Sequence, residues 1–261
     1  MIEHNFKKKF GQNFISDKNL LEAIVNDAKI SKDDNVLEIG AGAGTLTSEI
    51  SKYAKNVVSY EIDEDLKEHL LDLKLENVKF VFGDIMEQSL ENIEKYFVDD
   101  YKIIANLPYY ITTPIIFKFL NNSKKLKSLT IMVQKEVAER IVAKKGGKDY
   151  GVLSVMIQFF GEAKITRIVN RKMFFPEPNV DSAVVNIELK NKNENIIDKD
   201  KFYIFIQDCF AMRRKTLKNN LMQSRVVDKN KINEIDDKIL LLRSEKLSLE
   251  ELIDIYKHIS I

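Results

Sequence analysis

Two short segments contain the residues whose types and spacing point to chemistry. Asn106-Leu107-Pro108-Tyr109 follows an apolar run and offers, in succession, a carboxamide, a backbone carbonyl and a stacking ring. The segment 38–44 (EIGAGAG) follows another apolar run and forms a loop where backbone can approach a ligand closely. The first segment suits the exocyclic amine of a flat base, and the second suits a cofactor held against backbone. Together they predict methyl transfer from S-adenosylmethionine to a nucleobase amine.

The chemistry of an amine that accepts a methyl group explains the order of residues in the first segment. An adenine amine is a poor nucleophile because its lone pair is delocalised into the ring. The side-chain oxygen of Asn106 and the carbonyl of Leu107 can accept its two hydrogens and favour the pyramidal nitrogen of the transition state. Pro108 would stiffen the turn, and Tyr109 would stack on the extruded base. The alternative is a strand-ending turn with a core tyrosine.

The glycine loop has the spacing G-x-G-x-G at Gly40, Gly42 and Gly44. A dinucleotide-binding loop is similar, but its third glycine would stand one place later, at Thr45. A simple strand-to-helix turn is the other alternative. Glu38, two residues before the first glycine, can face the positive end of an adenosylmethionine.

Three further residues lie at the end of a predicted strand or at the start of a stiff loop. Glu61 lies 21 residues after Gly40 (61 − 40) and can accept both ribose hydroxyls, although a surface acid is the alternative. Asp84 can accept from the adenine amine of the cofactor, although Gly-Asp also forms ordinary turns. Phe174 precedes Pro176 and Pro178 and can supply a second stacking face for the target base, although a core phenylalanine is nearly as consistent with the pattern.

Strands and helices alternate along the first two thirds of the chain, and most of the candidate site residues lie at the ends of these strands. This alternation predicts a parallel sheet covered on both faces, with ligands bound beyond the carboxyl ends of the strands. A polar segment after Leu189 indicates a linker, and the remainder is helical in pattern. The expected strands are 35–40, 57–61, 78–84, 101–105 and 129–134, and the expected helices include 45–54, 64–73, 115–120, 135–143 and a basic stretch at 210–221.

Composition limits the function classes. The 261 residues are 44% hydrophobic and 31% charged, which is enough for a packed core and a solvated surface. The net charge of +1 does not itself support a nucleic-acid enzyme, but basic residues cluster at 7–9, 124–125, 144–148 and 213–215. Each cluster alone is typical of a solvated face, whereas four of them indicate a distributed RNA footprint.

Other residue types argue against several alternatives. A single cysteine, Cys209, excludes an internal disulfide and fits a reducing compartment. The three histidines are scattered and give no metal site. No apolar run is long enough to span a membrane, so we expect a cytoplasmic protein.

These segments resemble the rRNA adenine N6-dimethyltransferase family. The resemblance is carried by 11–14 (GQNF), 36–47 (VLEIGAGAGTLT), 106–112 (NLPYYIT), 132–141, 150–155, 174–185 and 213–221, which cover nearly the whole chain. Leu107, the segment 174–178 and the segment 213–217 are similar to the bacterial small-subunit branch. Where Leu107 stands, the branch acting on large-subunit RNA more usually has isoleucine.

The resemblance implies an α/β fold: a Rossmann-like class I methyltransferase domain over residues 1–190, with a seven-stranded, mostly parallel sheet, and a small all-α domain over residues 191–261. It implies dimethylation of N6 on two adjacent adenosines in a hairpin loop near the 3′ end of small-subunit rRNA, within the assembling 30S subunit. We expect a monomer. Cofactor contacts are implied for Asn13, Ile15, Gly40, Glu61, Asp84 and Asn106, and the target adenine is assigned to Asn106, Leu107, Pro108, Tyr109 and Phe174. The family usually has leucine at Ile15, where a backbone contact is expected.

Two other functions remain open. One is a ribosome-assembly factor whose methylation is incidental. The other is DNA adenine methylation, which is disfavoured because the tetrapeptide then usually begins with Asp.

Overall fold

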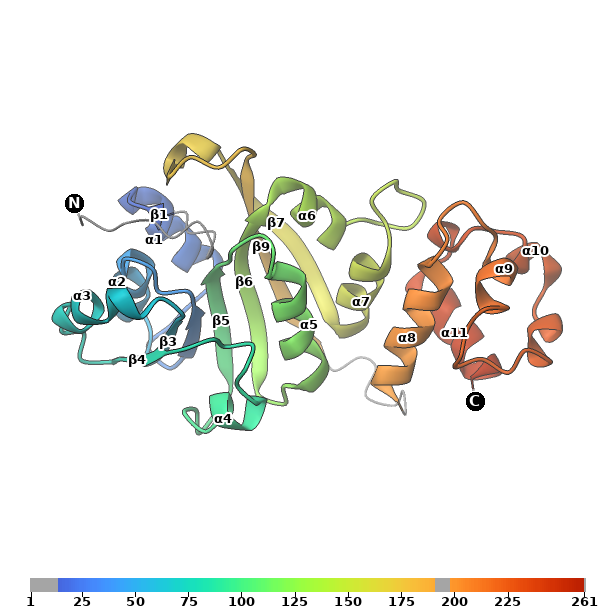
Figure 1. Cartoon of the computed structure of the whole chain (residues 1–261), viewed down its shortest axis with the longest axis horizontal. Helices are drawn as coiled ribbons and strands as arrows, with labels where there is room; N and C mark the ends of the chain where they lie inside the picture. The colour runs from blue at the N-terminus through green and yellow to red at the C-terminus, as the bar shows by residue number, and fades with distance from the viewer. Residues whose placement is uncertain (1–13, 191–197, 261) are drawn as a thin grey trace. The chain divides into compact units, whose positions relative to one another are not determined.

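The computed structural model describes residues 14–190 and 198–260. Its main element is a seven-stranded sheet in the order β4-β3-β2-β5-β6-β9-β7 (Figure 1). The first five of these strands run parallel, and β9 pairs antiparallel with β6. This confirms the seven-stranded, mostly parallel sheet. The strands are β2 (Asn35–Ile39), β3 (Asn56–Glu61), β4 (Val78–Phe82), β5 (Tyr101–Asn106), β6 (Leu126–Gln134), β7 (Gly161–Val169) and β9 (Ser182–Leu189).

The order of the strands creates the place where a ligand can bind. Strand β2 lies between β3 and β5, so the chain passes to one side of β2 and then to the other. Ligands of open α/β sheets bind beyond the carboxyl ends of the strands at such a switch point. Here Ile39, the last residue of β2, pairs with Ala105 near the end of β5.

Helices with apolar faces cover the sheet. Helix α1 (Lys18–Asp27) begins where the Asp17 side chain accepts from the Leu20 N–H, and it buries Leu20, Leu21, Ile24 and Val25. On the other face α5 (Thr112–Asn122) packs against β6 (Figure 1). The remaining helices of this part are α2 (Thr45–Ser51), α3 (Lys67–Asp72), α4 (Leu90–Glu94) and α6 (Lys135–Ile141), with single 3-10 turns at Glu64–Leu66 and Arg171–Met173.

A separate two-stranded ribbon joins two distant segments. Strand β1 (Phe14–Ile15) pairs antiparallel with β8 (Phe174–Phe175), so Ile15 lies opposite Phe174. Both of these residues are buried in the core cluster that includes α1. The predicted second base-stacking segment therefore lies beside the N-terminal segment.

Contacts divide the chain into two compact units. One consists of Met1–Ala138 and Lys164–Leu189, and the other of Glu139–Ala163 and Lys190–Ile261. The domain boundary after residue 190 stays a prediction, and the structure adds that α7 packs with the C-terminal helices. The second unit contains α7 (Val152–Phe160), α8 (Lys199–Phe210), α9 (Leu217–Leu221), α10 (Asp237–Leu240), α11 (Leu249–Ile259) and 3-10 turns at Lys231–Glu234 and Ser244–Lys246.

Aromatic side chains form the core of the second unit. Phe202 lies 4.7 Å from Phe159 and 5.2 Å from Tyr256, measured between ring centroids. Cys209 is fully buried in this unit, and burial raises the pKa of its thiol.

The prediction of a continuous basic helix over 210–221 was wrong. Helix α8 ends at Phe210 and α9 begins at Leu217, capped by the Thr216 hydroxyl. The Asn220 side chain holds the intervening loop, because its Nδ2 donates to the Cys209 carbonyl and its Oδ1 accepts from the Met212 N–H. The basic residues 213–215 are therefore presented on a fixed loop. Throughout the described ranges, no helix combines the length and apolarity needed to cross a membrane.

Candidate active site

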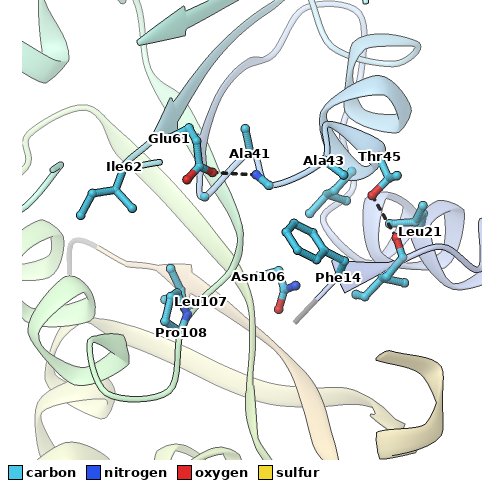
Figure 2. A pocket seen from close by; sticks show the side chains of 14 residues that line it. Phe14, Leu21, Ala41, Ala43, Thr45, Glu61, Ile62, Asn106, Leu107 and Pro108 are labelled. Carbon is cyan, nitrogen blue, oxygen red and sulfur yellow. Dashed lines mark hydrogen bonds between the residues drawn. The ribbon is translucent and has the colours of Figure 1, made fainter. Parts of the chain in front are cut away.

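A cavity opens beyond the carboxyl ends of β2, β3 and β5. The glycine loop forms one wall, the ribbon strand β1 another, and the segment after β5 a third (Figure 2). Figure 2 shows Phe14, Glu61 and Asn106 around one space. The lining residues are Phe14, Ile15, Leu21, Gly40, Ala41, Gly42, Ala43, Thr45, Leu46, Glu61, Ile62, Asn106, Leu107 and Pro108.

The glycine loop needs its glycines for two reasons. Gly40, Gly42 and Gly44 all have positive φ angles, of 85°, 55° and 74°. A Cβ on Gly42 would also lie 2.9 Å from Cε1 of Phe14. A side chain at Gly42 would thus displace the ring that forms the opposite wall of the cavity.

Gly40 stands at the junction of the two chemistry-bearing segments. Its N–H donates to the Tyr60 carbonyl at 2.8 Å, and a Cβ there would lie 3.7 Å from the Asn106 carbonyl oxygen. The ends of β2 and β5 therefore bring the glycine loop and Asn106 together, as the sequence predicted.

Glu61 is held rigidly at the end of β3. Its side-chain oxygens accept from the N–H groups of Gly42 at 2.7 Å and Asp63 at 2.8 Å, and the residue is 4% exposed. Burial raises the pKa of this carboxyl, while the two backbone donors oppose that shift. Because a carboxylate has about four lone-pair sites, acceptor capacity remains for two hydroxyl groups.

Asp84 lines a second cavity next to the first. This second cavity shares Gly40, Ile62 and Pro108 with the first and adds Asp84 and Ile85. The Asp84 Oδ1 accepts from the Met86 N–H at 2.7 Å, which fixes the turn after β4. The other residues that line the second cavity are Ile39, Tyr60, Gly83, Tyr110, Ile111 and Ile115.

The tetrapeptide after β5 divides between the cavities and the core. Asn106 is half-buried, Leu107 is buried, and both line the first cavity. Tyr109 lines neither cavity; its hydroxyl lies 3.0 Å from Ser182 Oγ. Phe174 also lines neither cavity and is 5% exposed within the core cluster. The structure thus brings together Ile15, Gly40, Glu61, Asn106, Leu107 and Pro108, with Asp84 adjacent.

Glu38 lies beneath the glycine loop and lines neither cavity, so the expectation that it faces the cofactor is not met. Its Oε2 accepts from the hydroxyls of Thr47 at 2.6 Å and Ser59 at 2.5 Å. Burial raises the pKa of this carboxyl to about 7. The side chain therefore ties β2 to β3 and α2, the helix that follows the loop.

Sequence reasoning missed two cavity residues. Phe14 belongs to the motif 11–14, which gives no sign that its ring lines the cavity. Ile62 lies between Glu61 and Asp63, and an apolar residue directly after a strand-ending acid is the signal that predicts its place in the cavity wall. Asn13 lies outside the described residues. The Ile15 carbonyl accepts from the Thr45 hydroxyl at 3.0 Å, so the backbone of Ile15 is fixed to the start of α2.

Comparison with known proteins gives a consistent result. The family model described as "Ribosomal RNA adenine dimethylase" matches residues 3–260. The Ribosomal RNA small subunit methyltransferase A of Mycoplasma mobile is 45% identical over 241 residues, which span 92% of this chain and 91% of that protein. The protein of the same name from Clostridioides difficile is 40% identical over 262 residues, with 95% and 90% covered.

Solved structures show the same architecture. A dimethyladenosine transferase from Plasmodium falciparum superposes with a TM-score of 0.78 at 26% identity, over 94% of this chain and 97% of that one. The 23S rRNA methyltransferase ErmE superposes with a TM-score of 0.69 at 24% identity, over 93% and 98%, which shows a shared fold.

Proposed function

The chain belongs to the ribosomal RNA adenine dimethylase family, and we propose that it dimethylates N6 of adenosine in small-subunit rRNA with S-adenosylmethionine. The observation that carries the proposal is the meeting of the glycine loop, Glu61 and Asn106 in one cavity at the switch point of the sheet. Members of this family have the Rossmann-like fold of class I methyltransferases. The close relatives named above favour the small subunit over other RNA.

The residues around the two cavities fit the proposed cofactor. The glycine loop gives a cradle that a single Cβ would fill at Gly42. Glu61 would accept the ribose hydroxyls, and Asp84 would accept the adenine amine in the neighbouring cavity, whose walls of Ile62 and Ile85 suit a flat ring. Asn13, Ile15, Gly40 and Asn106 complete the proposed contacts. Adenosylmethionine supplies a methyl group activated by a positively charged sulfur.

Asn106 and Leu107 would prepare the acceptor amine. Both hydrogens of the adenine N6 would be held by the Asn106 side-chain oxygen and the Leu107 carbonyl, so its lone pair is directed at the methyl carbon. Bound adenosylmethionine would supply the methyl group with the sulfur as leaving group, and one N–H proton of the methylated amine would go to water. Pro108 would stiffen the turn, and Tyr109 and Phe174 would supply the stacking faces for the base.

The second unit presents a basic surface suited to the RNA backbone. Arg213, on the loop between α8 and α9, donates through Nη2 to the Lys148 carbonyl, so two basic clusters that are distant in sequence adjoin. Lys144, Lys145 and Lys148 are exposed, as are Arg213, Arg214 and Lys215. Phosphate contacts of this kind supply sequence-independent affinity. Of the other two predicted clusters, Lys7 to Lys9 lies outside the described residues, and Lys124 with Lys125 lies between α5 and β6.

We propose two adjacent adenosines near the 3′ end of the rRNA as the target, with the protein acting as a cytoplasmic monomer during 30S biogenesis. The test incubates unmethylated 30S subunits with the protein and labelled adenosylmethionine, followed by nucleoside mass spectrometry. We expect four methyl groups per subunit, carried by two N6,N6-dimethyladenosines. Label on another base, or in large-subunit RNA alone, would contradict the proposal.

A further inference from the structure

A lysine behind the second cavity makes unusually complete contacts. Lys118 is half-buried on α5. Its ammonium donates to three backbone carbonyl oxygens: Ile85 at 2.9 Å, Met86 at 2.9 Å and Gln88 at 2.5 Å. A lysine ammonium has three donor hydrogens, so this geometry occupies all of them.

The turn that Lys118 holds is the one that carries Asp84. The peptide between Ile85 and Met86 makes both contacts, because its carbonyl accepts from the Lys118 ammonium and its N–H donates to Asp84 Oδ1. Upstream, the Gly83 N–H donates to the Glu61 carbonyl at 2.8 Å. The turn is therefore anchored to β3 at its start and to Lys118 at its end.

The ammonium stabilises the convergence of the three carbonyl oxygens. Their oxygens carry like partial charges, and hydrogen bonds to a charged donor are stronger than neutral ones. Burial lowers the pKa of Lys118, and the Asp84 charge opposes that shift. An uncharged side chain at this position would leave the carbonyls to reorient, and Asp84 would move with them.

We propose that Lys118 is a positioning residue for the adenine end of the cofactor, holding the 84–88 turn so that Asp84 and Ile85 form one wall of the second cavity. The inference rests on the proposed function, because it takes this cavity to receive the adenosyl group. Lys118 itself lines neither cavity, so it acts through the turn.

The test compares Lys118→Met, Lys118→Arg and a control, Lys102→Met. Lys102 is also half-buried and its Nζ binds the Lys29 carbonyl at 2.7 Å and Asp34 at 2.9 Å, but it stands near the amino end of β5, away from the cavities. Calorimetry would measure binding of S-adenosylhomocysteine and of methylthioadenosine, which lacks the amino-acid portion. Steady-state assays on 30S subunits would separate kcat from the KM for adenosylmethionine.

We expect Lys118→Met to weaken both ligands by about tenfold, which corresponds to about 1.4 kcal/mol, and to raise KM with kcat retained. Lys118→Arg should fall between Met and wild type, and Lys102→Met should bind like wild type. If Lys118→Met does not fold, Lys118→Gln decides the matter, because it keeps donor hydrogens but removes the charge, and wild-type affinity in it would overturn the inference. Wild-type affinity in a folded Met variant, or equal losses in the control, would also overturn it. Wild-type protein that binds neither ligand would instead defeat the proposed function.

Discussion

Replacement of Glu38 by Gln should remove a specific pH dependence of stability. Burial raises the pKa of this carboxyl from its ordinary value of 4.5 to about 7 in the folded protein. Between these two values the folded state binds more protons than the unfolded state, so stability falls as pH rises through the window and is constant above it. A pKa difference of this size between the folded and unfolded protein corresponds to about 3 kcal/mol of unfolding free energy.

The glutamine variant keeps the contacts while losing the titration. Its carbonyl oxygen can still accept from the hydroxyls of Thr47 and Ser59. Its amide nitrogen would take the place of Oε1, which has no hydrogen-bond partner among the described residues, and this cost does not vary with pH. The difference in unfolding free energy between wild type and variant isolates the carboxyl, because other titrating groups cancel.

Urea unfolding at a series of pH values provides the measurement. Between about pH 5 and about pH 8, the wild type should lose roughly 2–3 kcal/mol more than Glu38→Gln, with fluorescence and circular dichroism giving the same midpoints. Parallel pH profiles for the two proteins would refute the account of Glu38 as a buried carboxyl that binds its proton more tightly when folded.

Three further variants test the cavity and the basic surface. Glu61→Ala should weaken S-adenosylhomocysteine binding by about 1–3 kcal/mol in calorimetry, because hydroxyl partners and two backbone donors lose their acceptor; unchanged affinity would exclude Glu61 from the ribose site. Gly42→Ala should destabilise the fold by about 1–2 kcal/mol because Gly42 has a positive φ, and it should weaken binding of the same ligand because the added methyl group contacts Phe14. Gly151→Ala is the control and should have neither effect, because Gly151 lies in extended backbone with open space around it. Neutralising Arg213, Arg214 and Lys215 together should flatten the salt dependence of RNA binding and leave cofactor affinity unchanged; a salt slope equal to wild type would remove this loop from the RNA interface.

The sequence predicted the parallel part of the sheet well, because its strands are short apolar runs that end in Gly, Glu or Asn. It did not reveal β7, a half-buried strand with exposed charges at Glu162 and Lys164, so its pattern is weakly apolar. It also did not reveal α7, since the run 152–160 is apolar except at Ser154 and Gln158, and a short apolar run does not distinguish a helix from a buried strand.

The candidate site was predictable where residue type and strand end coincide, as at Gly40, Glu61 and Asn106. It was not predictable where function depends on distant pairing. Phe14 reaches the glycine loop only because β1 pairs with β8, and Lys118 reaches the Asp84 turn only because α5 crosses behind it. Glu38 is a residue for which the sequence predicted a contact that the fold does not provide. Its place next to the glycine loop indicated a cofactor contact, but side chains alternate along β2, and the Glu38 side chain lies on the same buried face of the sheet as Ser59.

The most direct test of the central claim, methyl transfer at Asn106, is a single-turnover assay of the Asn106→Ala variant on unmethylated 30S subunits at saturating adenosylmethionine. Asn106→Asp serves as the matched control because it keeps an acceptor oxygen. The account predicts that the alanine variant methylates adenosine about 100-fold more slowly or worse, the scale of losing one transition-state hydrogen bond, while it still folds and binds RNA, and that the aspartate variant retains more activity. Near-normal dimethylation by the alanine variant would contradict the assignment of the reaction to this site.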